Sequence, residues 1–271
     1  MPLKLNRAIS LYVMSSPSLA PFAAASYEHF RSVTVGGWEA LFGRMREVGP
    51  DSVVLVDPYE GGAAAPSGKL FQLLESFPSV SVVVALHLAP ARVGDVRRMM
   101  DAGAAGVLDL AMDTTPAVAV RHFYDAVGRP FKRRVQEVLP AHLTADARVM
   151  IRAACEVAVL GGGARELADA FDVAPKTFAA WCESRRLPTT RALQLWLRLL
   201  LAALLLEDAG RTVQSAARAA GYSGDRALRR AFDQLLGSGP GTLRRGGAFE
   251  AVARAFADQL RTIDIARRAA A

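Results

Sequence analysis

Residues 211–232 read RTVQSAARAAGYSGDRALRRAF and predict two short helices joined by a tight turn. Apolar residues recur at helical spacing over Val213–Ala220, which gives the first of these helices one buried face. Gly221 can adopt a positive φ without steric cost, so it can end that helix abruptly. Ser223 and Asp225 are both residue types that cap the start of a following helix.

The second helix of this stretch presents arginines to its surroundings. Leu228 and Phe232 lie four residues apart and mark its inner face, whereas Arg226, Arg229 and Arg230 lie mostly off that face. Arginine offers a bidentate fork to guanine and to phosphate, so such a helix suits a DNA groove. The alternative interpretation is a solvated basic helix face.

Charge is distributed unevenly along the 271 residues. Residues 130–271 hold 22 lysines and arginines and 14 acidic residues, a net charge of +8. Residues 1–129 hold 11 and 12 respectively, a net charge of −1, and the whole chain carries +7. A basic C-terminal half attached to a near-neutral N-terminal half predicts a polyanion-binding module joined to a second domain.

A second helix-turn-helix candidate precedes the first. Ala164–Phe171 predicts a helix with an apolar inner face, and Asp172–Ala174 predicts a short turn. Pro175 then sits where the first turn of a helix tolerates proline, and the helix continues over Lys176–Arg186 with Phe178 inward.

A long helix joins the two candidates. Thr189–Asp208 is apolar nearly all round, so we expect it to be buried between two small bundles. It spans about 20 residues, or roughly 30 Å, and one turn of B-DNA is about 34 Å. A rigid helix of this length can place two reading helices in successive major grooves on one face of a duplex.

Residues from about Arg165 to Arg245 resemble the AraC-type (arabinose-regulator) DNA-binding domain. The positions that match the pattern of its second half are Gly221, Tyr222, Ser223, Arg230, Phe232, Gly237, Pro240 and Arg244 or Arg245. The first half matches at Leu167, Ala168, Pro175 and Phe178, and at Arg198 in the linking helix, where a structural role is expected. The resemblance implies a cytoplasmic transcription regulator that binds double-stranded DNA.

The chain departs from that family pattern in both halves, and the departures weaken phosphate contacts and leave the first unit poorer in base-reading groups. Ala180 stands where the family usually has an arginine, and Glu183 and Asp233 replace usual lysines. Ala227 and Leu228 replace a usual aromatic pair. We therefore expect the second helix-turn-helix to carry more of the affinity. The residues expected to contact DNA are Lys176, Thr177, Arg185, Arg186, Ser223, Arg226, Arg229 and Arg230.

The first 128 residues alternate between strand and helix patterns. The strands are expected at Ala8–Val13, Ser32–Val35, Ser52–Val56, Val80–Leu86 and Gly106–Leu110. The helices are expected at Leu19–Arg31, Trp38–Val48, Lys69–Phe77, Val93–Ala102 and Pro116–Val127. Five βα units of this size predict an α/β domain with a doubly wound parallel sheet, followed by an all-α C-terminal domain.

Residues 51–62 and 93–110 resemble the receiver domains of response regulators, with Asp57 near the phosphoacceptor position. Phosphoryl transfer there needs further acids to hold Mg²⁺, together with a hydroxyl and a lysine. The acids are replaced by Met14–Ser16, and the hydroxyl and lysine positions fall on Ala85 and Leu110. We therefore expect a degenerate receiver in which Asp57 is phosphorylated slowly or not at all.

Other classes of function find little support. No nucleophile-elbow, P-loop or dinucleotide-binding motif is present, so we expect no enzyme and no cofactor. Cys155 and Cys182 lack metal-ligand spacing, and the four histidines are scattered, so we expect no metal. The longest apolar run, Leu199–Leu206, is too short to cross a bilayer, and the N-terminus lacks a signal-peptide pattern.

The expected domains are 1–128 (receiver-like), 129–142 (linker), 143–247 (double helix-turn-helix) and 248–271 (an amphipathic helix). The last helix either packs on its own domain or pairs with another subunit. Expected partners besides DNA are a second copy of the chain, RNA polymerase, and an unknown effector or partner protein. Two alternatives remain: a response regulator controlled by phosphorylation of Asp57, and an interaction adaptor that no longer reads DNA.

Overall fold

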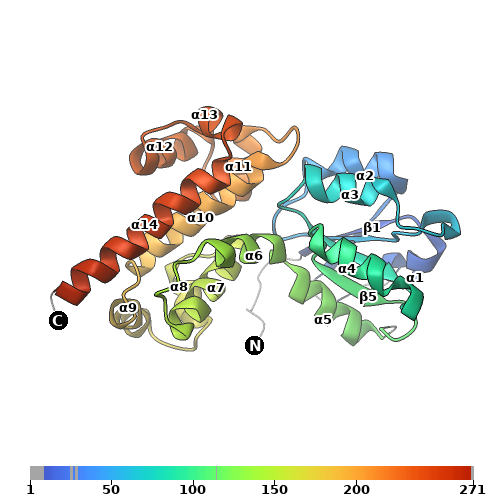
Figure 1. Ribbon diagram of the computed structural model, residues 1–271, viewed down its shortest axis with the longest axis horizontal. Coiled ribbons are helices and arrows are strands. Elements are labelled where there is room, and N and C mark those ends of the chain that lie inside the picture. The colour runs from blue at the N-terminus through green and yellow to red at the C-terminus, as the bar shows by residue number, and fades with distance from the viewer. Residues whose placement is uncertain (1–8, 25–26, 28–29, 114, 270–271) are drawn as a thin grey trace. The chain divides into compact units, whose positions relative to one another are not determined.

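The computed structural model describes residues 9–24, 27, 30–113 and 115–269, which divide into two compact units (Figure 1). The N-terminal domain holds residues up to Pro130 together with Asp208–Gly210. The C-terminal domain holds Phe131–Glu207 and the residues from Arg211 onward.

The N-terminal domain is built on one parallel sheet. Its strands are β1 (Ile9–Met14), β2 (Phe30–Val35), β3 (Val53–Val56), β4 (Ser81–Leu86) and β5 (Gly106–Asp109). They lie in the order β2-β1-β3-β4-β5, and every neighbouring pair is parallel. This is the strand order of doubly wound, flavodoxin-like sheets, to which receiver domains belong. The expected fold class is therefore confirmed for this domain.

The middle of the sheet is apolar on both faces. All four residues of β3 and all six of β4 are buried. Val54 pairs with Val82, and Val84 pairs with Val107, so β-branched side chains stack across three neighbouring strands. Continuous apolar runs of this kind are stable only where helices cover both faces of a parallel sheet.

A helix follows each strand of the sheet. They are α1 (Ala20–Ala24), α2 (Gly37–Met45), α3 (Gly68–Ser76), α4 (Val93–Asp101) and α5 (Pro116–Ala126), with single 3₁₀ turns at Pro17–Leu19, Glu60–Gly62 and Pro90–Arg92. Helices α1 and α5 meet through Phe22 and Phe123, whose ring centroids are 6.4 Å apart. Helix α2 meets the end of α3 through Phe42 and Phe77, at 6.2 Å.

One expected helix is wrong in its extent. The sequence pattern predicts a helix over Leu19–Arg31, but α1 ends at Ala24 and the chain is already in strand β2 at Phe30. The ring of Phe30 packs edge-on against Phe123 and Tyr124, at 5.7 and 4.9 Å. This aromatic cluster and the pairing of β2 with β1 override the local helical pattern. Ala8, the first residue of the expected strand Ala8–Val13, lies outside the described residues. His29, one of the four histidines, lies outside them too.

The C-terminal domain is entirely helical in its described part. Its helices are α6 (Arg129–Val138), α7 (Ala145–Val159), α8 (Ala164–Asp169), α9 (Pro175–Ser184), α10 (Thr190–Glu207), α11 (Val213–Ala219), α12 (Asp225–Leu236), α13 (Pro240–Arg245) and α14 (Ala248–Ala269). Much of the stretch expected as a linker is thus helix α6.

Helix α10 is the core of this domain. Every residue from Leu199 to Leu206 is buried, as its all-round apolar pattern predicts. Helices α7, α11 and α14 all pack against it. The amphipathic stretch at the C-terminus packs on its own domain, with Phe249, Val252, Phe256 and Leu260 buried. None of the helices in the described part of the chain is long and apolar enough to span a membrane.

Candidate DNA-binding site

The second helix-turn-helix consists of α11 and α12. Gly221 ends α11 with a φ of +79°, and the backbone N–H of Tyr222 donates to the Ala217 carbonyl at 2.9 Å. This is the left-handed ending that the glycine predicts. Burial raises the pKa of the Tyr222 phenol to about 12.

The expected cap of the reading helix α12 is wrong. Neither Ser223 nor Asp225 caps it, because Gly224 occupies the N-cap position without a side-chain hydrogen bond. Asp225 is instead the first helical residue. The negative charge of its carboxylate is stabilised there by the positive N-terminal end of the helix dipole. Ser223 lies exposed in the turn.

The first helix-turn-helix, α8 and α9, repeats the same turn with different residues. Asp172 has a φ of +53°, and the N–H of Val173 donates to the Ala168 carbonyl at 3.2 Å. Aspartate tolerates this conformation better than most side chains. Glu166 reaches back to the Gly163 N–H at 2.9 Å. Such backbone hydrogen bonds hold the pKa of the Glu166 carboxyl below its ordinary value.

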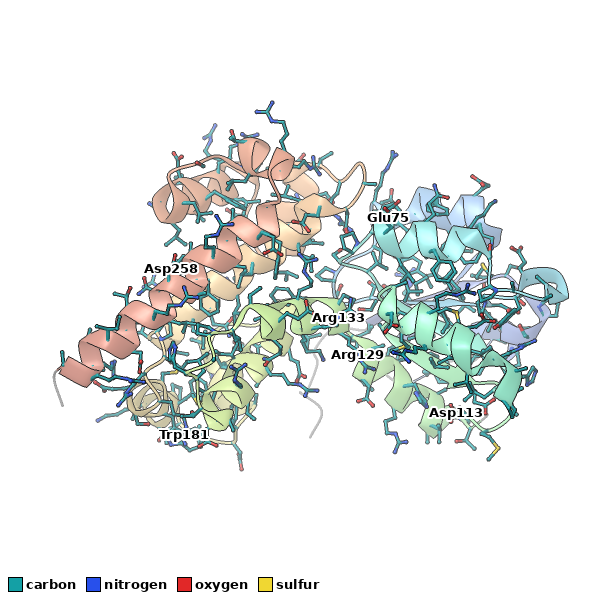
Figure 2. The ribbon with its side chains drawn as sticks, in the orientation of Figure 1. Glu75, Asp113, Arg129, Arg133, Trp181 and Asp258 are labelled. Carbon is teal, nitrogen blue, oxygen red and sulfur yellow. The ribbon has the colours of Figure 1, made fainter. Side chains whose placement is uncertain are left out.

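The inner faces of both reading helices are as expected. Leu228 and Phe232 of α12 are fully buried, and so is Phe178 of α9. Trp181, labelled in Figure 2, meets Phe171 edge-on at 6.1 Å and so ties α9 to the end of α8.

The outer face of α12 carries three exposed arginines, Arg226, Arg229 and Arg230. The Arg229 Nε lies 3.6 Å from the Asp225 carboxylate, one helical turn earlier. Among the described residues, Arg226 and Arg230 have no carboxylate within ion-pair distance. Their guanidiniums therefore extend from a rigid helix toward solvent, which suits them to an external anion.

Four residues of the first helix-turn-helix are expected to contact DNA, and they differ in whether other residues of the domain already bind them. Lys176 and Thr177 are exposed in the first turn of α9. Arg185 and Arg186 follow the end of that helix, and carboxylates of the same domain engage them. Arg185 Nη2 lies 3.2 Å from Asp146. Arg186 Nη1 lies 2.9 Å from Asp264.

Two further arginines connect separate elements of the C-terminal domain. Arg198 of α10 donates to the Gly162 carbonyl at 2.9 Å, so it ties the linking helix to the entry of the first helix-turn-helix. Arg244 of α13 donates to the Leu206 carbonyl at 2.7 Å and also to the Arg211 carbonyl. The sequence placed Arg244 only as a match to the family pattern, because a bond to a distant carbonyl leaves no signal in local spacing.

The Asp57 carboxylate lies among hydroxyl groups. Oδ2 accepts hydrogen bonds from Ser16 Oγ at 3.0 Å and from Ser18 Oγ at 2.7 Å. Oδ1 accepts one from the Tyr59 N–H at 2.9 Å. The described residues form no group of three or more His, Cys, Asp or Glu side chains that could hold a metal ion.

Residues 167–246 match the family model described as a helix-turn-helix domain, which confirms the AraC-type resemblance over this region. A comparison with curated proteins found no match. Among solved structures, full-length FixJ from B. japonicum is 11% identical, with a TM-score of 0.36. That match covers 88% of this chain and 99% of FixJ.

The two glycines of the second turn provide a matched test of its geometry. Gly221→Ala forces an alanine to a φ of +79°, so we expect it to lower the free energy of unfolding by about 1–2 kcal/mol. Gly224 has extended backbone, and a Cβ added there would meet nothing within 4 Å. Gly224→Ala should therefore change the free energy of unfolding by less than about 0.5 kcal/mol. Amide hydrogen exchange of the α11 and α12 peptides measures both. Equal effects of the two substitutions would contradict the assigned turn.

Proposed function

We propose that the chain is a sequence-specific, DNA-binding transcription regulator without enzymatic activity, acting in the cytoplasm. The observation that carries the proposal is the pair of helix-turn-helix units joined by one buried helix, with exposed arginines on α12. The family match over residues 167–246 supports the same function.

In this proposal the second helix-turn-helix supplies most of the affinity. Arg226 and Arg230 are free to reach base edges and phosphates, and Arg229 exchanges its weak contact with Asp225 for one with DNA. Lys176, Thr177 and Ser223 add contacts from exposed positions. Arg185 and Arg186 contribute less, because their guanidiniums already bind carboxylates of the domain.

The N-terminal domain acts as a sensory or dimerisation module that does not depend on phosphorylation. Ser16 and Ser18 hydroxyls approach Asp57 where a receiver needs acids for Mg²⁺. A second copy of the chain would double the number of DNA contacts and raise avidity. RNA polymerase and an effector or partner protein complete the proposed set of partners.

Neutralising the arginines of α12 tests the proposed DNA contact. We expect Arg226→Ala/Arg229→Ala/Arg230→Ala to weaken binding to duplex DNA. Each bidentate contact with a base that is lost should reduce the binding free energy by about 1–3 kcal/mol. The slope of log affinity against log salt should also fall by about one for each phosphate that is no longer neutralised. Fluorescence anisotropy across a salt series measures both quantities.

The matched control is Arg31→Ala/Arg97→Ala/Arg121→Ala, which removes the same net charge from exposed positions of the N-terminal domain. It should leave the affinity and the salt slope close to those of the wild type. If the α12 variant binds DNA with the affinity and salt slope of the wild type, these arginines do not contact DNA and their assigned role is wrong.

The second test concerns Asp57. After incubation with acetyl phosphate and Mg²⁺, we expect the intact mass of the wild-type chain to be unchanged, because a single carboxylate makes a poor Mg²⁺ site. Asp57→Asn is the control for modification at other residues. A phosphoryl adduct that forms on the wild type and is absent from Asp57→Asn would establish the phosphorylation-controlled alternative instead.

A further inference from the structure

Helix α14 runs antiparallel to the linking helix α10 along its whole length. The start of α14 meets the end of α10, where the Phe249 N–H donates to Glu207 Oε1 at 2.9 Å. Midway, the rings of Trp196 and Phe256 lie 5.8 Å apart. At 22 residues, α14 is roughly 33 Å long, and it lies outside the matched helix-turn-helix region, residues 167–246. Figure 1 shows the two helices side by side.

The N-terminal end of α14 is fixed beside the second helix-turn-helix. It follows α13 directly in the chain, and α14 contacts both α12 and α13. Arg134 of α6 lies 3.0 Å from the Glu250 carboxylate and stacks its guanidinium 4.7 Å from the centre of the Phe249 ring. Arg244 joins α13 to the end of α10 at the same place.

The C-terminal end of α14 is fixed beside the first helix-turn-helix. Asp264 is only 8% exposed and binds Arg186 at 2.9 Å and Arg268 at 2.9 Å. Arg267 Nη1 donates to the Glu183 carbonyl, in the last turn of α9, at 2.6 Å. Burial raises the pKa of the Asp264 carboxyl, but the hydrogen bonds from the two arginines outweigh it, so the pKa is below its ordinary value.

Arg186 occupies a backbone position that normally suits glycine. Its φ is +57°, and the Leu187 N–H closes the end of α9 on the Cys182 carbonyl at 2.8 Å. The left-handed residue that follows α12 is a glycine, Gly237, with a φ of +64°. At position 186 an arginine is therefore strained relative to a glycine. Its guanidinium reaches buried Asp264, which is a contact that glycine could not make.

We propose that α14 is a brace that fixes the distance and angle between the reading helices α9 and α12, with Asp264 as the positioning residue at its C-terminal end. The brace makes the double helix-turn-helix one rigid body, so it restricts the spacing between half-elements that the domain accepts. This consequence for spacing rests on the proposed DNA binding, whereas the rigidity itself does not.

The rigidity can be measured without DNA. Spin labels at Ala180→Cys on α9 and Gln234→Cys on α12 occupy exposed positions, and the native Cys155 and Cys182 are buried. Electron–electron distance measurements should give one narrow distribution for the labelled parent chain. Adding Asp264→Ala should broaden that distribution, because it removes the carboxylate that both Arg186 and Arg268 bind.

Two further variants separate the proposal from general damage to the fold. Arg186→Gly removes the guanidinium but accepts the left-handed backbone, so it should broaden the distribution while keeping the helix content. Asp258→Ala removes an exposed carboxylate of the same helix that pairs only with Arg261 among the described residues (Figure 2), so it should leave the distribution narrow. A narrow distribution in folded Asp264→Ala or Arg186→Gly would overturn the brace.

A second readout uses a duplex enriched from a random library and the same duplex with one base pair inserted between its half-elements. The insertion moves one element by about 3.4 Å and rotates it by about a tenth of a turn. It should weaken wild-type binding by about tenfold or more and weaken Asp264→Ala binding clearly less. Equal discrimination by both proteins would contradict the role of the brace in spacing, and failure of both to bind would contradict the proposed function alone.

Discussion

The burial of α10 is the constraint on which the C-terminal domain depends. An eight-residue apolar run, Leu199–Leu206, is removed from water on all sides, and each large apolar side chain contributes about 1.5–3 kcal/mol when fully buried. Because α10 is apolar all round, helices must surround it, and α7, α11 and α14 do so. The two helix-turn-helix units are thereby joined through one buried helix.

Polar contacts connect the helix-turn-helix units to the helices packed around them. Arg198 and Arg244 reach backbone carbonyls near the two helix-turn-helix units. Asp264, which is largely buried, pairs with the half-exposed Arg186 side chain just after the end of α9. Arg226, Arg229 and Arg230 of α12 take no part in these contacts and remain exposed. The N-terminal domain is organised around a parallel sheet whose central strands are apolar, and the Asp57 carboxylate accepts hydrogen bonds from the Ser16 and Ser18 hydroxyls.

Much of this architecture could be predicted from the sequence, because local patterns determine it. The apolar periodicity from residue 248 onward indicated helix α14, and Gly221 marked the end of α11. The failures have tertiary causes. Phe30 is drawn into strand β2 by the aromatic cluster around Phe123, and Gly224 takes the cap position expected for Ser223 or Asp225. The Arg186–Asp264 pair joins residues 78 positions apart, which no local pattern can indicate.

The most direct test of the central claim is selection of purified full-length protein against a random duplex library at about 150 mM salt, followed by sequencing, since non-specific affinity is weak there. We predict enrichment of a motif with two half-elements about one helical turn apart, or about 10 base pairs. Enrichment of no motif, with only weak and salt-sensitive binding, would contradict the account of two reading helices held on one rigid frame.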